Sequence, residues 1–596
     1  MRRRRTFGLA ALGAAAALAL GACSSSGSSA SSGSTASPTS SPGTTGFNAG
    51  VTSVVNPSTK TGGTLTFDWR SAPDSFDPGN TYYASDWDFA RLYSTALMTY
   101  KNCPGACGKT LIPALATAPG TVSNNGLTWT YHIKSGYKFQ DGTPVTSQDV
   151  KYAVERTFDR GVLTNGPSYF QVLLGGNAAS YPGPYKDRSK NLMGLTAIDT
   201  PDASTIVFHL KAPFSDFDYV AAIPQTAPIP PDKDTGTSYQ THIMSTGPYE
   251  FQSYQLNKSA VLVPNPQWKA SLDPSATQLA SKIVVNMTMN PNDVDNRLLA
   301  GDAQIDFAGT GVQAAARAKI LSNPSLKAQS DDPLTGFGWF FYIDSQVAPF
   351  TNVACRRAVE YATNHLNMQN AYGGPVAGGQ IGTTVMPPTI SGYTSFDLYE
   401  AASKPQGDAA KAKQELQACN QPSGFSTGIA YRSDRPTETQ GAQALQQALS
   451  AVGIKTTLHG YPTATYYTNF AGVPKYMSSH NIGIAFGGWG PDWPDGYGFL
   501  DELTNGNTIV PAGNTNIGML NDPVVNNLFT KAAGITNATE RNAIWGQIDH
   551  QVMSDAVIVP IVYAKALIYR PASLTNVYFS QGYSLNNYAV SGVTGG

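Results

Sequence analysis

A half-buried strand and a capped helix follow each other closely in this chain, and the pair limits the fold more than any other feature. Apolar and polar residues alternate over residues 127–133, which is the pattern of a strand with one buried face. Helical spacing of apolar residues then runs from Val150 to Phe158, directly after the capping pair Thr146 and Asp149. The chain therefore combines strands with helices.

The same mixture continues toward the end of the chain. Residues 206–210 repeat the strand pattern, and a helix over 445–452 leads into a strand over 454–458. A further helix near 541–553 precedes the apolar strand 557–563. Short strands and helices that alternate in this way predict an α/β body.

The N-terminus has the features of an export signal. Four arginines precede an apolar run that is too short to span a bilayer. The run ends in Leu20-Gly21-Ala22-Cys23, which resembles the lipobox of bacterial lipoproteins. The resemblance implies cleavage before Cys23 and diacylation, and stable anchoring does require more than one acyl chain. An ordinary secretory signal and a cytosolic chain with an apolar start are the alternatives.

Residues 24–46 predict a flexible tether, because Ser, Gly, Thr, Ala and Pro follow one another there without an apolar period. We therefore expect an extracytoplasmic protein that lipidated Cys23 anchors to the outer face of the cell membrane. The tether would hold the folded part away from that membrane.

The remaining four cysteines form an even set, which in an oxidising compartment favours disulfides. Cys103 and Cys107 bound a compact loop and predict one bridge, which leaves Cys355 and Cys419 for a second. A metal site is the alternative, although Cys-x2-Cys pairs and nearby His-x3-His partners are missing from the sequence.

Size and charge narrow the class of protein further. The 596 residues allow roughly two to four domains or one large two-lobed body. Basic and acidic residues number 39 and 40, so the chain lacks the basic field that nucleic-acid binding needs. We expect a monomer without cofactor or metal.

Several short motifs follow one another along the chain. The most specific runs from Leu127-Thr128-Trp129-Thr130 through Gly136 to Val150. The others include Ser75-Phe76-Asp77-Pro78, Ser245-Thr246-Gly247-Pro248-Tyr249, Leu298-Leu299-Ala300-Gly301-Asp302 and Trp489-Gly490-Pro491-Asp492-Trp493. Together they resemble family 5 of the bacterial extracellular solute-binding proteins, the group of oligopeptide- and dipeptide-binding components of ABC importers.

The resemblance implies a two-lobed periplasmic-binding-protein-like α/β fold whose lobes close over a ligand about a hinge. It implies the following parts: signal peptide 1–22; tether 23–60; lobe I from 61–100, 228–332 and 555–596; an inserted domain 101–227 beside lobe I; and lobe II 333–554.

The resemblance also points to ligand-binding residues. Asp492 matches the acidic residue with which peptide-binding relatives hold the ligand's amino terminus, although Asp492 and Asp495 are also typical of a turn. Trp489 and Trp493 either line a cleft or pack beneath it. The further candidates are Tyr431, Arg432, Asp77 and Tyr83.

The implied function is capture of di- or oligopeptides and their delivery to ABC permease subunits. A non-peptide solute such as an oligosaccharide or metal chelate, and a peptide-sensing lipoprotein, remain alternatives. We do not expect an enzyme, because the sequence has no nucleophile elbow, zinc-binding His-Glu-x-x-His, P-loop or dinucleotide fingerprint.

Overall fold

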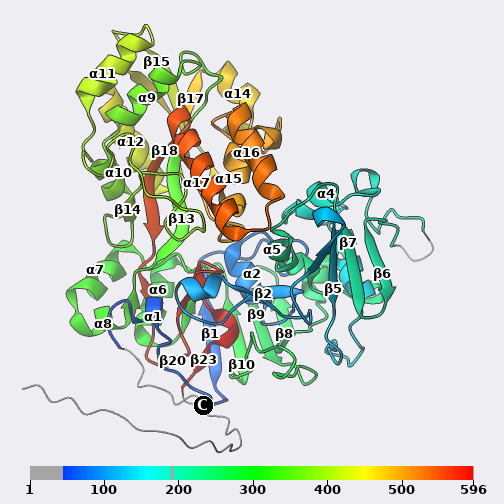
Figure 1. Ribbon diagram of the computed structural model, residues 1–596. Coiled ribbons are helices and arrows are strands. Elements are labelled where there is room, and N and C mark those ends of the chain that lie inside the picture. The colour runs from blue at the N-terminus through cyan, green and yellow to red at the C-terminus, as the bar shows by residue number, and fades with distance from the viewer. Residues whose placement is uncertain (1–44, 190–192, 595–596) are drawn as a thin grey trace, which may run out of the picture. The chain divides into compact units, whose positions relative to one another are not determined.

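The structure is a computed structural model that describes residues 45–189 and 193–594. Cys23 and residues 24–44 of the predicted tether 23–60 lie outside the described residues. Residues 45–60 are described, and part of this stretch is packed rather than free, because α1, Ala49–Thr52, contains buried residues and Val55 pairs with Val577. Sheets of four, five and six strands organise the described chain (Figure 1). Across both described ranges, no helix is long and apolar enough to cross a membrane.

The predicted strand and capped helix lie in and beside the four-stranded antiparallel sheet. Its order is β4 Thr121–Ser123, β5 Thr128–His132, β7 Thr205–His209 and β6 Ile198–Asp202. Helix α3, Ser147–Arg156, contacts β6 and β7. The backbone N–H and hydroxyl of Thr146 donate to the Asp149 carboxylate at 2.7 and 2.8 Å. The prediction for this stretch is confirmed.

The five-stranded sheet mixes parallel and antiparallel pairs. Its order is β11 Ile305–Asp306, β1 Thr64–Asp68, β10 Lys282–Asn286, β9 Ser259–Pro264 and β8 Tyr249–Gln255. Strand β1 is parallel to both β10 and β11. The segment after β1 leads through Tyr82 and Tyr83 into α2, Ala84–Ala90, which carries the first wall of the site described below.

The six-stranded sheet is packed on both faces. Its order is β14 Gly379–Ile381, β18 Ile558–Lys565, β13 Leu334–Ile343, β17 Ile482–Trp489, β15 Ser426–Arg432 and β16 Lys455–Tyr461. Phe340 and Tyr342 pack with apolar residues of α15 Gly496–Thr504 and α17 Ala538–Asp555. Phe341 and Ile343 pack with those of α9 Val353–Ala362 and α12 Pro436–Ser450. Period-two alternation in β13 thus contributes side chains to two separate cores. Helices lie on both faces of this sheet (Figure 1).

One predicted boundary is wrong. Lobe II was expected to end at residue 554, but β18 pairs with β13 from Leu334↔Lys565 to Tyr342↔Ile558. The chain therefore stays in the six-stranded sheet through Lys565. An apolar run predicts a buried strand but does not name its partner, which here lies more than 200 residues earlier.

Candidate functional site

A cavity of about 330 Å³ lies beyond the carboxyl ends of the parallel neighbours β15 and β17. Ligands of open α/β sheets bind at this kind of edge. One wall comes from the segment around α2, with Tyr82, Tyr83 and Trp87. The other comes from the six-stranded sheet and its loops, with Phe337, Trp339, Tyr342, Tyr467 and Trp489.

Glycines in and after β17 make room for the aromatic wall. A Cβ on Gly488 would lie 2.2 Å from the ring of Trp339, and one on Gly490 would lie 2.4 Å from the ring of Phe337. These contacts are far shorter than van der Waals distance, so the two rings need glycine opposite them. The sequence Gly488-Trp489-Gly490 is thus explained by the aromatics of β13.

Asp492 is the acidic residue of the cavity lining. Tyr82 Oη donates to its Oδ2 at 2.9 Å, and the Tyr169 hydroxyl also donates to Oδ2. The backbone N–H of Asp492 donates to the Gly498 carbonyl at 3.0 Å and so fixes the turn. Burial raises the pKa of Asp492 to about 7, although both tyrosine hydrogen bonds lower it; the negative charge of Glu502 adds to the rise.

Arg432 lines the cavity but is neutralised within the protein. Its Nε donates to Glu438 Oε2 at 2.9 Å, its backbone N–H donates to the same oxygen at 3.0 Å, and its Nη2 pairs with Glu438 Oε1. The guanidinium lies 5.5 Å from the ring centroid of Tyr467. Arg432 therefore supports the aromatic wall as well as lining the cavity.

The structure separates the predicted binding residues into two groups. Asp492, Trp489, Arg432 and Tyr83 line the cavity, and Tyr83 is 58% exposed there. The other three do not. Tyr431 packs on the helix α12 side of the sheet and is absent from the cavity lining.

Asp77 has a structural role. Its Oδ1 and Oδ2 accept from Arg156 Nη1 and Nη2 at 3.0 and 2.7 Å, and Oδ1 also accepts from the Gly79 N–H at 3.0 Å. Both partners of this ion pair are buried. Because the carboxylate is satisfied inside the protein, its place in the motif reflects folding rather than ligand contact.

Trp493 is also turned away from the cavity. Its side chain is 1% exposed and joins the core of the segment that contains the four-stranded sheet. It stacks on Tyr219 at 5.9 Å and contacts Tyr169 at 4.9 Å, measured between ring centroids. Of the two outcomes considered for this residue, packing beneath the cleft is the one that the structure shows.

Asp495 lies two residues after Trp493, close to Asp216 and Arg541 from distant parts of the chain. It is buried together with Asp216, whose Oδ1 forms an ion pair with Arg541 at 2.8 Å. Burial raises the pKa of Asp216 well above its ordinary value, and the negative charge of Asp495 adds to the rise. Asp495 Oδ1 also accepts from the Tyr497 N–H at 3.0 Å, so it caps α15.

Sequence reasoning missed several residues in or beside the cavity. Tyr82 and Tyr169, which hold Asp492, carry no local signal because they approach it from distant parts of the chain. Phe337 and Trp339 did carry one, since Gly-Phe-Gly-Trp alternates small and aromatic residues in a strand. Arg435, which follows β15 and lines the cavity, is not among the predicted residues, although the nearby Arg432 is.

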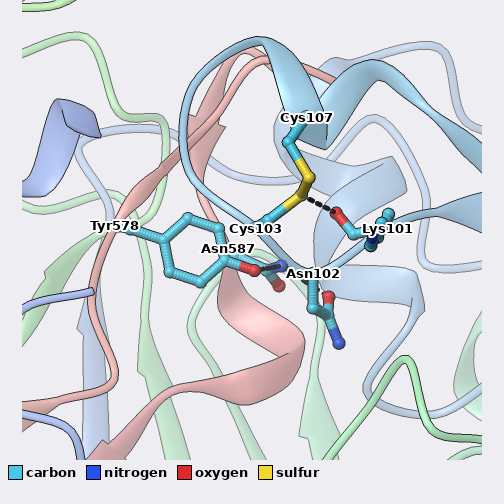
Figure 2. The surroundings of a disulfide bond; sticks show 6 residues. All are labelled: Lys101, Asn102, Cys103, Cys107, Tyr578 and Asn587. Carbon is cyan, nitrogen blue, oxygen red and sulfur yellow. Dashed lines mark hydrogen bonds between the residues drawn. A yellow bond between two sulfur atoms is a disulfide. The ribbon is translucent and has the colours of Figure 1, made fainter. Parts of the chain in front are cut away.

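The cysteines form two pairs at disulfide distance, in agreement with the predicted connectivity. Cys103 Sγ and Cys107 Sγ lie 2.02 Å apart in a loop beside Asn587 and Tyr578 (Figure 2). Cys355 Sγ and Cys419 Sγ lie 2.10 Å apart and connect α9 to the end of α11, Ala409–Ala418. Among the described residues, no group of three or more His, Cys, Asp or Glu could hold a metal ion.

A mixed α/β fold with an aromatic cavity at a sheet edge, lined by an acidic residue and two basic ones, is suited to binding a small solute. The sequence model described as "Bacterial extracellular solute-binding proteins, family 5 Middle" matches residues 110–509. The chain therefore belongs to family 5 of the bacterial extracellular solute-binding proteins. This is a family of binding proteins, and its fold is the two-lobed periplasmic-binding-protein fold.

Individual relatives cover nearly the same length. The probable D,D-dipeptide-binding periplasmic protein DdpA of Escherichia coli (strain K12) is 25% identical over 503 residues, which are 82% of this chain and 86% of that protein. The solved structure of clavulanic acid biosynthesis oligopeptide binding protein 2 is 37% identical, with a TM-score of 0.89 over 92% of this chain and 99% of that one. DppA from Helicobacter pylori in complex with peptide STSA shares the fold, with 20% identity and a TM-score of 0.69 over 90% of this chain and 99% of that one.

Proposed function

We propose that this protein captures peptides outside the cytoplasm in the cavity at Asp492 and delivers them to the permease of an ABC importer. The observation that carries the proposal is a single carboxylate, held by two tyrosine hydroxyls, in a cavity whose walls are otherwise mainly aromatic. The names of the relatives, which refer to dipeptide and oligopeptide binding, support the same conclusion.

The carboxylate of Asp492 suits the amino terminus of a peptide. Enclosing an ammonium group away from water is costly unless an opposite charge meets it. A charge-assisted hydrogen bond to Asp492 would offset that cost and fix the position of the peptide's first residue. The aromatic walls offer apolar contact to the side chains that follow.

Asp492 also suits a role in closure. Tyr82 precedes α2, Tyr169 begins α4, Tyr169–Leu173, and Asp492 follows β17, so one carboxylate joins three distant segments. We propose that these segments belong to lobe I, the inserted domain and lobe II as the sequence predicts, with lobe II extended through Lys565. A ligand at Asp492 would then bear directly on the contacts between the parts.

The proposal includes a lipid anchor on Cys23 and a non-catalytic role. An inhibitor of lipoprotein processing should leave a heavier precursor in cells, and Cys23→Ser should release the protein from the membrane fraction. An unchanged mass and an unchanged distribution would refute the anchor without affecting the peptide site. Loss of peptide uptake on deletion of the gene would support transport, whereas intact uptake would favour a sensing role.

The amino-terminal contact is tested by isothermal titration calorimetry with a free-amine peptide and its N-acetyl derivative. Asp492→Asn should weaken binding of the free-amine peptide by about tenfold or more, which corresponds to about 1.4 kcal/mol. It should change the affinity for the N-acetyl peptide little. Asp501→Asn is the matched control, because Asp501 is also buried with a pKa raised to about 7 but does not line the cavity. Equal loss for both peptides in Asp492→Asn would refute the role. Mass spectrometry of molecules released from the purified protein would identify the natural ligand.

A further inference from the structure

The bridge between Cys103 and Cys107 lies in the loop that connects β2, Met98–Tyr100, to β3, Leu111–Pro113 (Figure 2). Cys107 is exposed, whereas both cysteines of the other bridge are at most 5% exposed. Exposed disulfides are the ones that exchange most readily with dissolved thiols. The two bridges in the described part of the chain therefore differ in how easily a reductant reaches them.

The effect of the Cys103–Cys107 bridge is mainly local. It joins residues only four apart in the sequence, and a short loop loses little conformational freedom in the unfolded chain when it is closed. A Cβ on Gly108 would lie 2.7 Å from the Cys103 carbonyl oxygen, so the bridged loop folds back tightly just before Lys109. The Thr110 N–H donates to the Cys107 carbonyl at 3.1 Å and fixes the chain just after it. The bridge thus sets the position from which the Lys109 side chain starts.

A distant segment holds the ammonium group of Lys109. Its Nζ donates to the Thr389 carbonyl oxygen at 2.8 Å. Lys109 is half-buried, so this charge-assisted hydrogen bond is partly shielded from water, which strengthens it. The bond connects residues that are 280 positions apart in the sequence, and it therefore ties the bridged loop to the segment around Thr389.

The segment around Thr389 is in turn attached to the turn that carries Asp492. Ser391 lies two residues after Thr389, and its N–H donates to the Pro494 carbonyl at 3.1 Å. Ser391 also pairs with Asp495 in an isolated parallel bridge. Pro494 and Asp495 directly follow the cavity residue Asp492 in the sequence. A continuous series of contacts thus leads from the bridged loop to the cavity.

We propose that the Cys103–Cys107 bridge is a thiol-sensitive switch of the cavity at Asp492. Reduction frees the loop, and Lys109 loses its fixed position at Thr389, so the cavity holds its ligand less tightly. This inference rests on the proposed function and adds a means of regulating it.

A dithiol supplies the electrons for the switch. One thiolate of the dithiol attacks Cys107 Sγ, and Cys103 leaves as a thiolate that takes up a proton. The second thiol of the reductant then displaces Cys107 Sγ. Both cysteines end as thiols and the reductant ends as a disulfide.

Dithiothreitol added to the full folded protein tests the chemical step. Alkylation followed by mass spectrometry should find Cys103 and Cys107 modified, while the two buried cysteines stay protected. A Cys103–Cys107 pair that remains bridged as long as the protein is folded would overturn the inference. The same holds if this pair opens only together with the buried one.

Calorimetry with the tetrapeptide Ser-Thr-Ser-Ala tests the consequence for binding. Reduction should weaken binding about fivefold, because the position of one charge-assisted hydrogen bond is lost. Lys109→Met should weaken binding by the same factor in the oxidised protein and should remove most of the response to reduction. Lys101→Met is the matched control, since Lys101 is an exposed cation of the same loop; this variant should behave as wild type in both states.

Two results of the calorimetry would overturn the inference: equal affinity of the oxidised and the reduced wild type, and a full response to reduction in Lys109→Met. If no peptide binds, the proposed function fails, and hydrogen exchange of residues 385–393 then tests the switch without a ligand. Faster exchange in the reduced wild type and in oxidised Lys109→Met would support the switch, whereas unchanged exchange would refute it.

Discussion

Asp492→Asn is expected to stabilise the unliganded protein above neutral pH. The native pKa of about 7 lies above the ordinary value of 3.8, so the folded protein holds this proton more tightly than the unfolded chain does. Stability from the protonated group is complete below about pH 4 and is lost as the pH rises through 7. Asparagine keeps an oxygen that accepts from Tyr82 and Tyr169 but never ionises, so it avoids that loss.

The shift sets the size of the effect. A rise of about three pKa units corresponds to about 4 kcal/mol at pH values above 7, at about 1.4 kcal/mol per unit. Between about pH 5 and pH 8 the wild type loses about 3 kcal/mol of this amount, because ionisation of the native group is complete only above 7. The stability advantage of Asp492→Asn over the wild type should grow by that amount over the same interval.

Urea unfolding followed by tryptophan fluorescence at about pH 5 and about pH 8 measures this difference. Asp302→Asn is the control, because Asp302 is exposed and lies outside the cavity, and its advantage should not change with pH. An Asp492→Asn protein that is less stable than the wild type at about pH 8, or whose advantage is the same at both pH values, would refute the reasoning. The expected result would mean that the carboxylate that lines the cavity is held at a cost to stability.

Three further variants test contacts that stabilise the fold. Trp493→Ala should destabilise the protein by about 3–5 kcal/mol in urea unfolding, because the ring is fully buried among other aromatics; a loss below about 1 kcal/mol would place the ring at the surface instead. Arg541→Gln should cost about 3–5 kcal/mol, more at high pH than at low pH, since it leaves the buried carboxylate of Asp216 without its partner; a loss that does not vary with pH would contradict this. Replacing Cys355 and Cys419 together by serine should cost about 4 kcal/mol in urea unfolding, because that bridge closes a 64-residue separation. A double variant as stable as the non-reduced wild type would contradict this.

Local periodicity predicted the elements well, because strands and helices follow from residues that are close in sequence. The strand over 127–133 is β5, the helix after Thr146 is α3, and the apolar run 557–563 is β18. The partner of β18 could not be predicted in the same way. Pairing between β18 and β13 depends on contacts across more than 200 residues, and the apolar run alone fits any buried sheet.

The sequence predicted only part of the candidate site, because the site also depends on contacts between residues that are distant in the sequence. Asp492, Trp489, Arg432 and Tyr83, four of the candidates that the sequence offers, line the cavity. Asp77 does not, because Arg156 reaches its carboxylate from α3. Whether a polar residue is free for a ligand depends on which side chains arrive from elsewhere, and that information is not contained in a motif.

Trp489 and Trp493 illustrate this limit within a single turn. Trp489 ends β17, where its register opposite Gly338 leaves it at the cavity. After Pro491 the chain turns, and the Asp492 N–H bonds back to the Gly498 carbonyl. A Cβ on Gly498 would lie 2.7 Å from the Trp493 carbonyl, so glycine is needed for this tight turn. The second ring then meets Tyr219, about 270 residues earlier in the sequence, and that distant ring, rather than the spacing of the tryptophans, decides that Trp493 is buried.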